Sequence, residues 1–256
     1  MLSVNNIHTT LFLNLPRKIS FFEQIRRCNF LFIPMRREII QTSDGSKTIF
    51  LPEMNEQYHS VNGALTESNY VYVEKGYLFS KKQNPVVFEV GFGTGLNCIL
   101  TAVEAEKKKK TTHYYSIENF PLDRAVLEQL DHYSLFSDKE KSILKKIHSS
   151  EWNKMVQISD YFFLHKIYSD LRGFDFSDLK KFDIVYFDAF GPDKQPEMWT
   201  AQIFKAVFEQ CPNEAVFVTY SAKGEIRRQL TQIGFTMERL PGPPGKKQML
   251  RGIKKD

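Results

Sequence analysis

One apolar strand followed by closely spaced glycines restricts the fold of this 256-residue chain more than any other feature. Val86–Val90 predicts a buried strand, and Leu96–Glu106 predicts the helix that follows it. Between them stand Gly91, Gly93 and Gly95. Glycines at such a joint let the backbone turn tightly and approach a ligand closely. We therefore expect a parallel α/β sheet with a binding crevice at this joint.

The alternation of strands and helices continues to the C-terminus. Further strands are predicted over Tyr114–Ile117, Phe163–Tyr168, Phe182–Phe187 and Ala215–Tyr220, and helices over Leu122–Leu130, Ile143–Ile147, Ala201–Glu209 and Glu225–Ile233. The last two strands, Phe235–Leu240 and Lys247–Ile253, are joined by a loop too short for a parallel crossover. The final strand therefore runs antiparallel. The predicted fold class is α/β, with the seven-stranded Rossmann-like sheet that is typical of class I methyltransferases.

The chain before this sheet divides into two further parts. Residues 1–34 are basic and lack the unbroken apolar core of a secretory signal, so we predict an extension or a disordered arm. A helix over Phe21–Arg27 is the alternative. Residues 35–80 are predicted to form a small N-terminal β-rich subdomain, with a turn at Ser43–Ser46 and a strand over Asn69–Val73. Residues 81–256 are the predicted methyltransferase domain.

Composition excludes several classes of protein. The 42% hydrophobic and 25% charged residues are globular values, and no apolar run approaches the roughly 20 residues of a membrane span. Cys28, Cys98 and Cys211 lie far apart, which argues against a disulfide framework and a cysteine metal site. We expect a cytoplasmic protein without a metal. The net charge of +5 is compatible with a nucleic-acid partner.

The glycine loop indicates a cofactor without phosphate groups. Glu89 stands two residues before the first glycine, where an acid would repel a pyrophosphate and suits a cationic or hydroxyl-bearing ligand such as S-adenosyl-L-methionine. Glu118, at the end of the second strand, is placed to receive ribose hydroxyl groups. Asp170 follows the third strand, beside the adenine in this fold. The alternatives are a nicotinamide-binding loop or a plain turn. The predicted cofactor-binding residues are Glu89, Gly91, Phe92, Gly93, Gly95, Glu118, Asp170 and Asp188.

Asp188 ends the fourth strand, which is apolar enough to be central in the sheet. Aspartate is a poor strand residue, and ligands bind at the carboxyl ends of strands in open α/β sheets. We predict that Asp188 belongs to the active site. The alternative is that it starts a turn before Gly191-Pro192.

Five stretches carry a resemblance to a known family. They are Asp188–Pro192 with Pro196–Trp199, Tyr58–Ser60 with Gly63–Glu67, Gly91–Asn97, Thr219–Ala222 with Arg227-Arg228, and Gly242–Lys246. From about residue 40 to the C-terminus, the chain resembles the methyltransferase half of the MnmC tRNA-modification enzymes.

The resemblance implies a reaction and a substrate. It implies methyl transfer from S-adenosyl-L-methionine to the amine of 5-aminomethyl-2-thiouridine at the wobble position of tRNA, giving the 5-methylaminomethyl base. Many family members also carry a flavin oxidoreductase half that exposes this amine. This chain shows no second dinucleotide-binding loop. We therefore expect a separate enzyme to generate the amine, or a different natural substrate.

Asp188 is the predicted catalytic residue, which orients the amine and takes its proton. Aromatic loop residues could stack on a base, and basic residues near the C-terminus could contact phosphates. The predicted substrate-binding and RNA-binding residues are Tyr58, Glu67, Phe190, Trp199, Tyr220, Arg227, Lys246 and Lys247. Two other functions remain open at this point. One is methyl transfer to a small cationic amine such as a polyamine, and the other is a non-catalytic RNA-binding role on the same fold.

Overall fold

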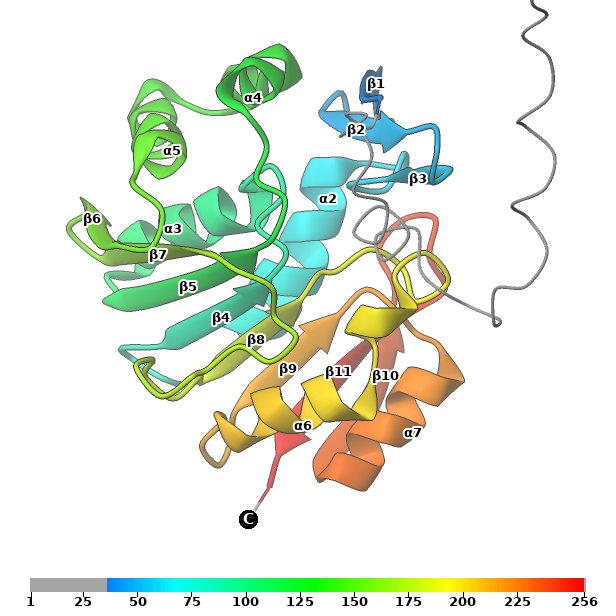
Figure 1. The fold of residues 1–256 in the computed structure, drawn as a ribbon. Helices are drawn as coiled ribbons and strands as arrows, with labels where there is room; N and C mark the ends of the chain where they lie inside the picture. The colour runs from blue at the N-terminus through cyan, green and yellow to red at the C-terminus, as the bar shows by residue number, and fades with distance from the viewer. Residues whose placement is uncertain (1–35, 256) are drawn as a thin grey trace, which may run out of the picture.

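The computed structural model describes residues 36–255, so the prediction for residues 1–34 lies outside the described residues. A small three-stranded sheet stands beside one large sheet (Figure 1). In the described part of the chain, no helix combines the length and apolar character needed to cross a membrane.

The large sheet confirms the predicted α/β fold class, with one strand more than expected. Its order is β10-β11-β9-β8-β4-β5-β7-β6. The strands are β4 (Val86–Val90), β5 (Thr112–Glu118), β6 (Met155–Ser159), β7 (Phe162–Tyr168), β8 (Ile184–Phe187), β9 (Val216–Thr219), β10 (Phe235–Pro241) and β11 (Gln248–Lys254). Strands β7, β5, β4, β8 and β9 are parallel, and β11 is antiparallel to both of its neighbours. The prediction of seven strands is wrong because β6 forms a hairpin with β7 at the sheet edge.

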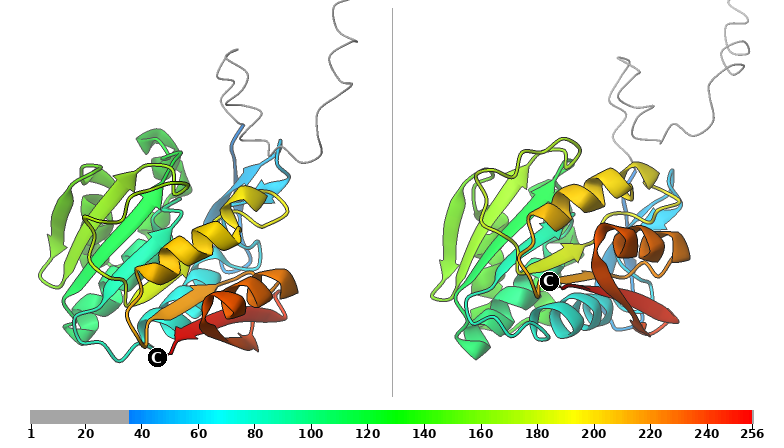
Figure 2. Two further views of the ribbon diagram at one scale, coloured as in Figure 1. Left: turned by 60° about the horizontal axis from the view of Figure 1, so that its bottom comes forward. Right: turned by 90° about the horizontal axis from the view of Figure 1, so that it is seen from below.

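Helices cover both faces of this sheet, as the views in Figure 2 show. One face carries α3 (Leu96–Lys108), α5 (Asp138–Ser149) and the helical segment α2–η1, and the other carries α6 (Ala201–Glu209) and α7 (Gly224–Ile233). All five residues of β4 are buried, as expected for a central parallel strand covered on both sides. The carboxyl ends of the parallel strands therefore meet at one edge of a rigid core.

The segment predicted as a strand over Asn69–Val73 is helical instead. Helix α2 (Ala64–Ser68) runs directly into η1 (Asn69–Tyr77), which is wound as a wider π-helix. Its apolar residues are buried against the sheet, where Gly76 lies close to Tyr186 and Val218. Valine and tyrosine are enriched in strands because they suit half-buried surfaces. Here they form the buried side of a helix. Of the residues predicted to be β-rich, 35–80, only the part up to Gln57 forms strands.

The small sheet contains β1 (Glu38–Gln41), β2 (Lys47–Leu51) and β3 (Glu56–Gln57). The predicted turn at residues 43–46 joins β1 and β2 as an antiparallel hairpin. This sheet packs against α4 (Arg124–Leu130) through a separate core of Ile49, Leu51, Met54, Leu127 and Leu130. Two short turns of helix, η2 (His132–Leu135) and η3 (Pro196–Met198), complete the described elements. The division of the chain at residue 80 stays a prediction.

Candidate active site

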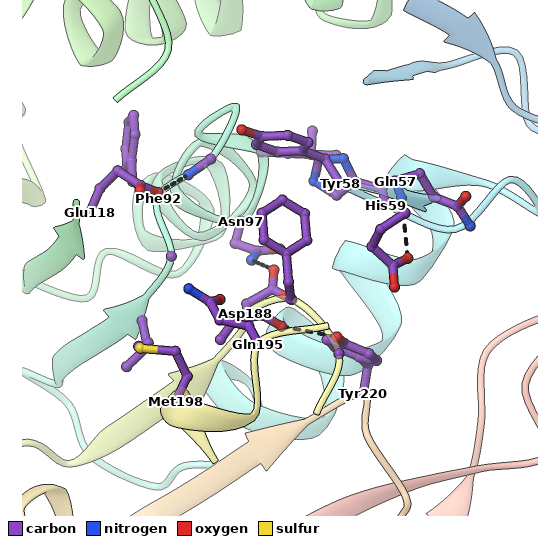
Figure 3. Close-up of a pocket in the computed structure, with 18 of the residues that line it drawn as sticks. Gln57, Tyr58, His59, Phe92, Asn97, Glu118, Asp188, Gln195, Met198 and Tyr220 are labelled. Atoms are coloured by element: carbon purple, nitrogen blue, oxygen red, sulfur yellow. Dashed lines mark hydrogen bonds between the residues drawn. The ribbon is translucent and has the colours of Figure 1, made fainter. Parts of the chain in front are cut away.

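A cavity of about 410 Å³ opens at the carboxyl ends of the parallel strands. Its size lies in the range of small-molecule and cofactor sites. Asp188 lies near its centre, with Glu118 and Phe92 to one side and Tyr220 and His59 to the other (Figure 3). We call the side of the cavity at the glycine loop the cofactor part, and the side beyond Asp188 the acceptor part.

The glycine loop brings two strand ends into close approach. Gly91 has a φ of +90°, and a Cβ atom there would lie 2.6 Å from the carbonyl oxygen of Asp188. Gly93 has a φ of +50°, and the Tyr58 ring packs 3.3 Å from its Cβ position. Both positions combine a left-handed backbone with a close neighbour, which only glycine accommodates without strain. At these two glycines, the cavity is therefore lined by backbone without side chains.

Glu118 ends β5 and lies in the cofactor part. One carboxylate oxygen accepts the N–H of Gly93 at 3.2 Å, and the other accepts the N–H of Phe120 at 2.8 Å. Burial raises the pKa of Glu118 above its ordinary value, and these two N–H groups oppose that rise. A carboxylate only accepts hydrogen bonds, so Glu118 is suited to hydroxyl donors such as those of a ribose.

Asp170 also lines the cofactor part, but its carboxylate is engaged by its own loop. The Arg172 guanidinium donates to both oxygens, from Nε at 3.1 and 3.2 Å and from Nη2 at 2.7 Å. This bidentate pair holds the loop that follows β7 against the cavity.

Asp188 is held by two donors, one from η1 and one from α3. The Tyr72 hydroxyl donates to Oδ1 at 2.5 Å, and Nδ2 of Asn97 donates to Oδ2 at 2.8 Å. Burial raises the pKa of Asp188 to about 6, although the hydrogen bonds from Tyr72 and Asn97 lower it. A carboxylate with this pKa, fixed in one orientation, can accept a proton near neutral pH.

Further ionisable side chains meet in the acceptor part. Lys246 forms an ion pair with Glu67 at 2.5 Å, and its Nζ lies 3.9 Å from the centre of the Tyr220 ring. Glu67 Oε2 also accepts the N–H of Ser60 at 2.8 Å. Lys246 thus lines the cavity, and its positive charge lowers the pKa of Asp188. The sequence predicts instead that Lys246 contacts a phosphate of the RNA.

Two aromatic rings meet at the cavity. Tyr58 and Phe190 form an edge-to-face pair with centroids 5.1 Å apart. Trp199, predicted as a third stacking residue, is 3% exposed and does not line the cavity. Its Nε1 donates to the Phe190 carbonyl at 2.7 Å, and Tyr220 Oη donates to the Ala189 carbonyl at 2.9 Å. Trp199 therefore braces the loop that presents Phe190.

Four other predicted residues lie outside the cavity. Glu89 is completely buried beneath it, and Gly95 begins helix α3 under the Phe92 ring. Arg227 is half-buried on α7, and Lys247 is exposed on the loop before β11. Glu89 therefore does not face the cavity, and its role in cofactor binding stays a prediction.

Sequence reasoning missed Tyr72 and Asn97 as site residues. Tyr72 was assigned to a strand, and its position on η1 is what aims its hydroxyl at Asp188. Asn97 offered a signal, because it is a buried polar residue in the first turn of a helix that follows a glycine loop.

Known proteins resemble this chain over most of its length. Residues 137–255 match a family described as S-adenosyl-L-methionine-dependent methyltransferase. The tRNA 5-methylaminomethyl-2-thiouridine biosynthesis bifunctional protein MnmC of Paraburkholderia xenovorans is 31% identical over 80% of this chain and 33% of its own length. The protein of the same name from Campylobacter hominis is 30% identical over 79% of this chain and 31% of its own length. The chain belongs to the S-adenosyl-L-methionine-dependent methyltransferases of the MnmC family.

The fold agrees with this family. The crystal structure of MNMC2 from Aquifex aeolicus superimposes with a TM-score of 0.68, at 24% identity, over 88% of this chain and 72% of that one. The chain spans about a third of the length of the curated MnmC relatives that it matches.

The cofactor part fits the cofactor of the family. S-adenosyl-L-methionine carries hydroxyl groups and cationic groups but no phosphate, which matches the exposed backbone of the glycine loop and the carboxylate of Glu118. Within the described residues, no three His, Cys, Asp or Glu side chains converge to hold a metal ion.

Glu118→Gln is expected to weaken binding of S-adenosylhomocysteine by roughly tenfold to a hundredfold, because hydrogen bonds to charged groups contribute about 1.5–3 kcal/mol. Isothermal titration calorimetry measures the change. Glu128→Gln, on the exposed side of α4, is the matched control and should bind normally. Equal affinity for S-adenosylhomocysteine in both variants would show that Glu118 does not bind the cofactor.

Proposed function

We propose that this MnmC-family methyltransferase methylates the primary amine of 5-aminomethyl-2-thiouridine at the wobble position of tRNA. The observation that carries the proposal is the place of Asp188, whose carboxylate lies between the glycine loop and the acceptor part of the cavity. The names of the MnmC relatives supply the substrate.

The acceptor part suits a cationic amine. Asp188, Glu67 and Glu56 line it, and Lys246, which also lines it, is paired with Glu67. An alkylamine with a pKa of about 10.4 is protonated at neutral pH and needs an anionic neighbour. Such an amine would replace water beside Asp188.

Asp188 prepares the amine for attack by taking its proton. A nitrogen nucleophile needs a free lone pair, and the proton moves from the ammonium group to a carboxylate oxygen of Asp188. The rise in the Asp188 pKa from 3.8 to about 6 reduces the cost of this transfer. At ~1.36 kcal/mol per unit, about two units are worth roughly 3 kcal/mol. When bound, S-adenosyl-L-methionine supplies the electrophilic methyl group, and the rest of catalysis is positioning.

The aromatic pair supports an RNA base as the acceptor. Anticodon bases are single-stranded, and proteins hold such bases by stacking them on aromatic side chains. Tyr58 and Phe190 lie at the cavity, and Trp199 holds Phe190 in place. We propose that this pair contacts the wobble base.

A basic surface beside the cavity supports binding of the RNA backbone. Arg228 Nη1 and Arg239 Nη2 lie 3.3 and 3.9 Å from the Cβ position of Gly224, so both guanidinium groups gather at the start of α7. Neither pairs with a carboxylate within residues 36–255. Helix α7 follows β9 and Tyr220, which places these groups near the acceptor part. We propose that they bind tRNA phosphates, together with Arg227 and Lys247.

The proposed reaction also has a place in a sequence of reactions. Its substrate must already carry a primary aminomethyl group on the base, so an enzyme that exposes this amine acts first. We propose that the chain works in the cytoplasm, where Cys98 and Cys211, the free and buried cysteines of the described residues, would stay reduced.

Asp188→Asn is expected to lower methyl transfer by about 10²–10⁴-fold, because the variant loses the proton acceptor. Nucleoside mass spectrometry of tRNA carrying the unmethylated 5-aminomethyl base detects the added methyl group. Binding of S-adenosylhomocysteine should change by no more than about threefold, since Asp188 acts on the acceptor. Asp160→Asn, in the turn before β7 at the far end of the sheet, is the matched control.

The outcomes separate the two candidate substrates. Methylation of a polyamine in place of tRNA would favour the small-molecule function, to which the acidic acceptor part is also suited. Normal turnover in Asp188→Asn would contradict the assigned role.

Tyr72→Phe is expected to shift the acid limb of the pH–rate profile to higher pH. The Tyr72 hydroxyl stabilises the ionised form of Asp188, so its loss raises the Asp188 pKa above about 6. Activity requires ionised Asp188 and is lost as the pH falls through this pKa. Tyr70→Phe, on the same helix with its hydroxyl on the Pro241 carbonyl, should keep the wild-type profile. An unshifted limb in Tyr72→Phe would exclude Asp188 as the titrating group.

The double variant Arg228→Ala, Arg239→Ala is expected to bind tRNA more weakly at low salt. The slope of log K against log salt should fall by about 0.7–0.9 for each lost phosphate contact. Lys107→Ala with Lys108→Ala, in the last turn of α3, removes the same charge from the opposite edge of the sheet. Equal salt slopes in the two double variants would place the RNA elsewhere.

A further inference from the structure

Lys166 is a buried lysine in the middle of β7, outside the residues that line the cavity. Its side chain is 2% exposed. Its Nζ donates to two backbone carbonyls in the last turn of α5, those of Ile147 at 3.0 Å and His148 at 3.2 Å. The last carbonyls of a helix have no partners within the helix and carry partial negative charge, so an ammonium group satisfies them. Lys166 therefore ties the end of α5 to the sheet.

The burial of this ammonium group is costly. It lowers the pKa of Lys166 to about 8, and core positions normally take apolar residues. A lysine at this position is thus explained by what its ammonium group holds, and not by packing alone.

His148 connects the end of α5 to the glycine loop. Its Nε2 lies 3.0 Å from the carbonyl oxygen of Thr94. A carbonyl oxygen only accepts, so Nε2 carries a proton and donates it to this bond. The same nitrogen lies 3.5 Å from the Cβ position of Gly95. Lys166 holds the backbone of His148, and the ring of His148 holds the loop.

The Phe92 ring, which lines the cavity, is held from the same side. It meets Trp152 edge to face, with ring centroids 5.7 Å apart. Lys166 Nζ lies 4.9 Å from the centre of the Trp152 ring and 5.6 Å from that of Phe92. Aromatic faces attract cations, so the ammonium group that ties down α5 also contacts a residue of the glycine loop.

The glycine loop has little means of fixing its own conformation. Gly91, Gly93 and Gly95 all have positive φ, and glycine loses more conformational freedom than any other residue when it is ordered. Phe92 and Thr94 stand between these glycines, and the contacts above hold both. A loop that is already ordered in the empty site avoids the entropic cost of ordering when the cofactor binds.

We propose that His148 is a positioning residue of the cofactor site: it holds the Thr94 carbonyl and so keeps the glycine loop in the conformation that binds S-adenosyl-L-methionine. Lys166 acts through His148 by fixing the end of α5. Neither side chain contacts the cofactor. The inference concerns cofactor binding, so it does not depend on which amine accepts the methyl group.

The role of His148 is tested by rescue in the full chain. His148→Ala removes the donor to Thr94 and is expected to weaken binding of S-adenosylhomocysteine by about three- to tenfold, the effect of one hydrogen bond. His148→Gln carries an amide N–H that can take the place of Nε2, and its affinity should return to within about twofold of the wild type. Isothermal titration calorimetry measures all three proteins. A glutamine variant as weak as the alanine variant, or an alanine variant with wild-type affinity, would overturn the proposal.

The link between the two residues is tested by a double-mutant cycle. Lys166→Met keeps an apolar side chain of similar length and removes the ammonium group, and it too should weaken binding of S-adenosylhomocysteine. When it is combined with His148→Ala, the total loss should be smaller than the product of the two single losses, because both changes release the same loop contact. Losses that multiply fully would overturn the claim that Lys166 acts through His148.

Ser137→Ala separates positioning from helix stability. Ser137 begins α5 and forms a capping box with Glu140, at the end of the helix that is far from the loop. Its loss should lower the melting temperature and leave the affinity for S-adenosylhomocysteine unchanged. If Ser137→Ala weakens binding as much as His148→Ala does, the effect belongs to the stability of α5, and the inference fails.

The outcomes also separate this inference from the proposed function. Binding of S-adenosylhomocysteine needs no tRNA, so a failure to methylate tRNA would remove the proposed acceptor and leave the role of His148 standing. Wild-type affinity in His148→Ala would remove that role and leave the proposed function standing.

Discussion

The close approach of Gly91 to the backbone of Asp188 is the constraint on which the site depends. Strands β4 and β8 pair in parallel, and the pairing continues past their ends, where the Asp188 N–H donates to the Val90 carbonyl at 3.0 Å. A side chain at position 91 would push these strand ends apart. The spacing between the glycine loop and the Asp188 carboxylate is thus set by hydrogen-bonded backbone, which tolerates little displacement. Tyr72 and Asn97 then need only to orient the Asp188 side chain.

The site balances charge in a way that fits two cationic ligands. The acids of the cavity outnumber its unpaired cations, since Lys246 pairs with Glu67 and Arg172 pairs with Asp170. Burial raises the pKa of Asp188 and of Glu118, and the negative charge of Glu67 adds to the rise at Asp188. A cationic ligand bound beside these carboxyl groups would lower their pKa, because it stabilises the ionised form.

Much of the fold could be predicted because its signals are local. Apolar strands, the glycine joint and the short loop before β11 each follow from residues that lie together in the sequence, and they define the parallel sheet and its antiparallel end. The error over Asn69–Val73 has a different origin. Val71, Tyr72 and Val73 are apolar because the sheet covers them, and burial alone does not distinguish a strand from a helix in a short run. Strand β6 was missed because it is half-exposed at an edge, where the apolar pattern is weakest.

The residues of the site also divide into those with a local signal in the sequence and those without one. Asp188 and Glu118 could be predicted because the ends of parallel strands always meet at one edge, so position along the strand is enough. Tyr72 and Asn97 could not be assigned to Asp188, because their hydrogen bonds span 116 and 91 residues of chain. Trp199 and Phe190 show the same limit for aromatic residues in one loop. Only the packed structure reveals that the Trp199 indole turns inward to the Phe190 carbonyl while Phe190 meets Tyr58 at the cavity. Chemistry at a strand end is therefore visible in the sequence, whereas the side chains that orient it are selected by tertiary packing.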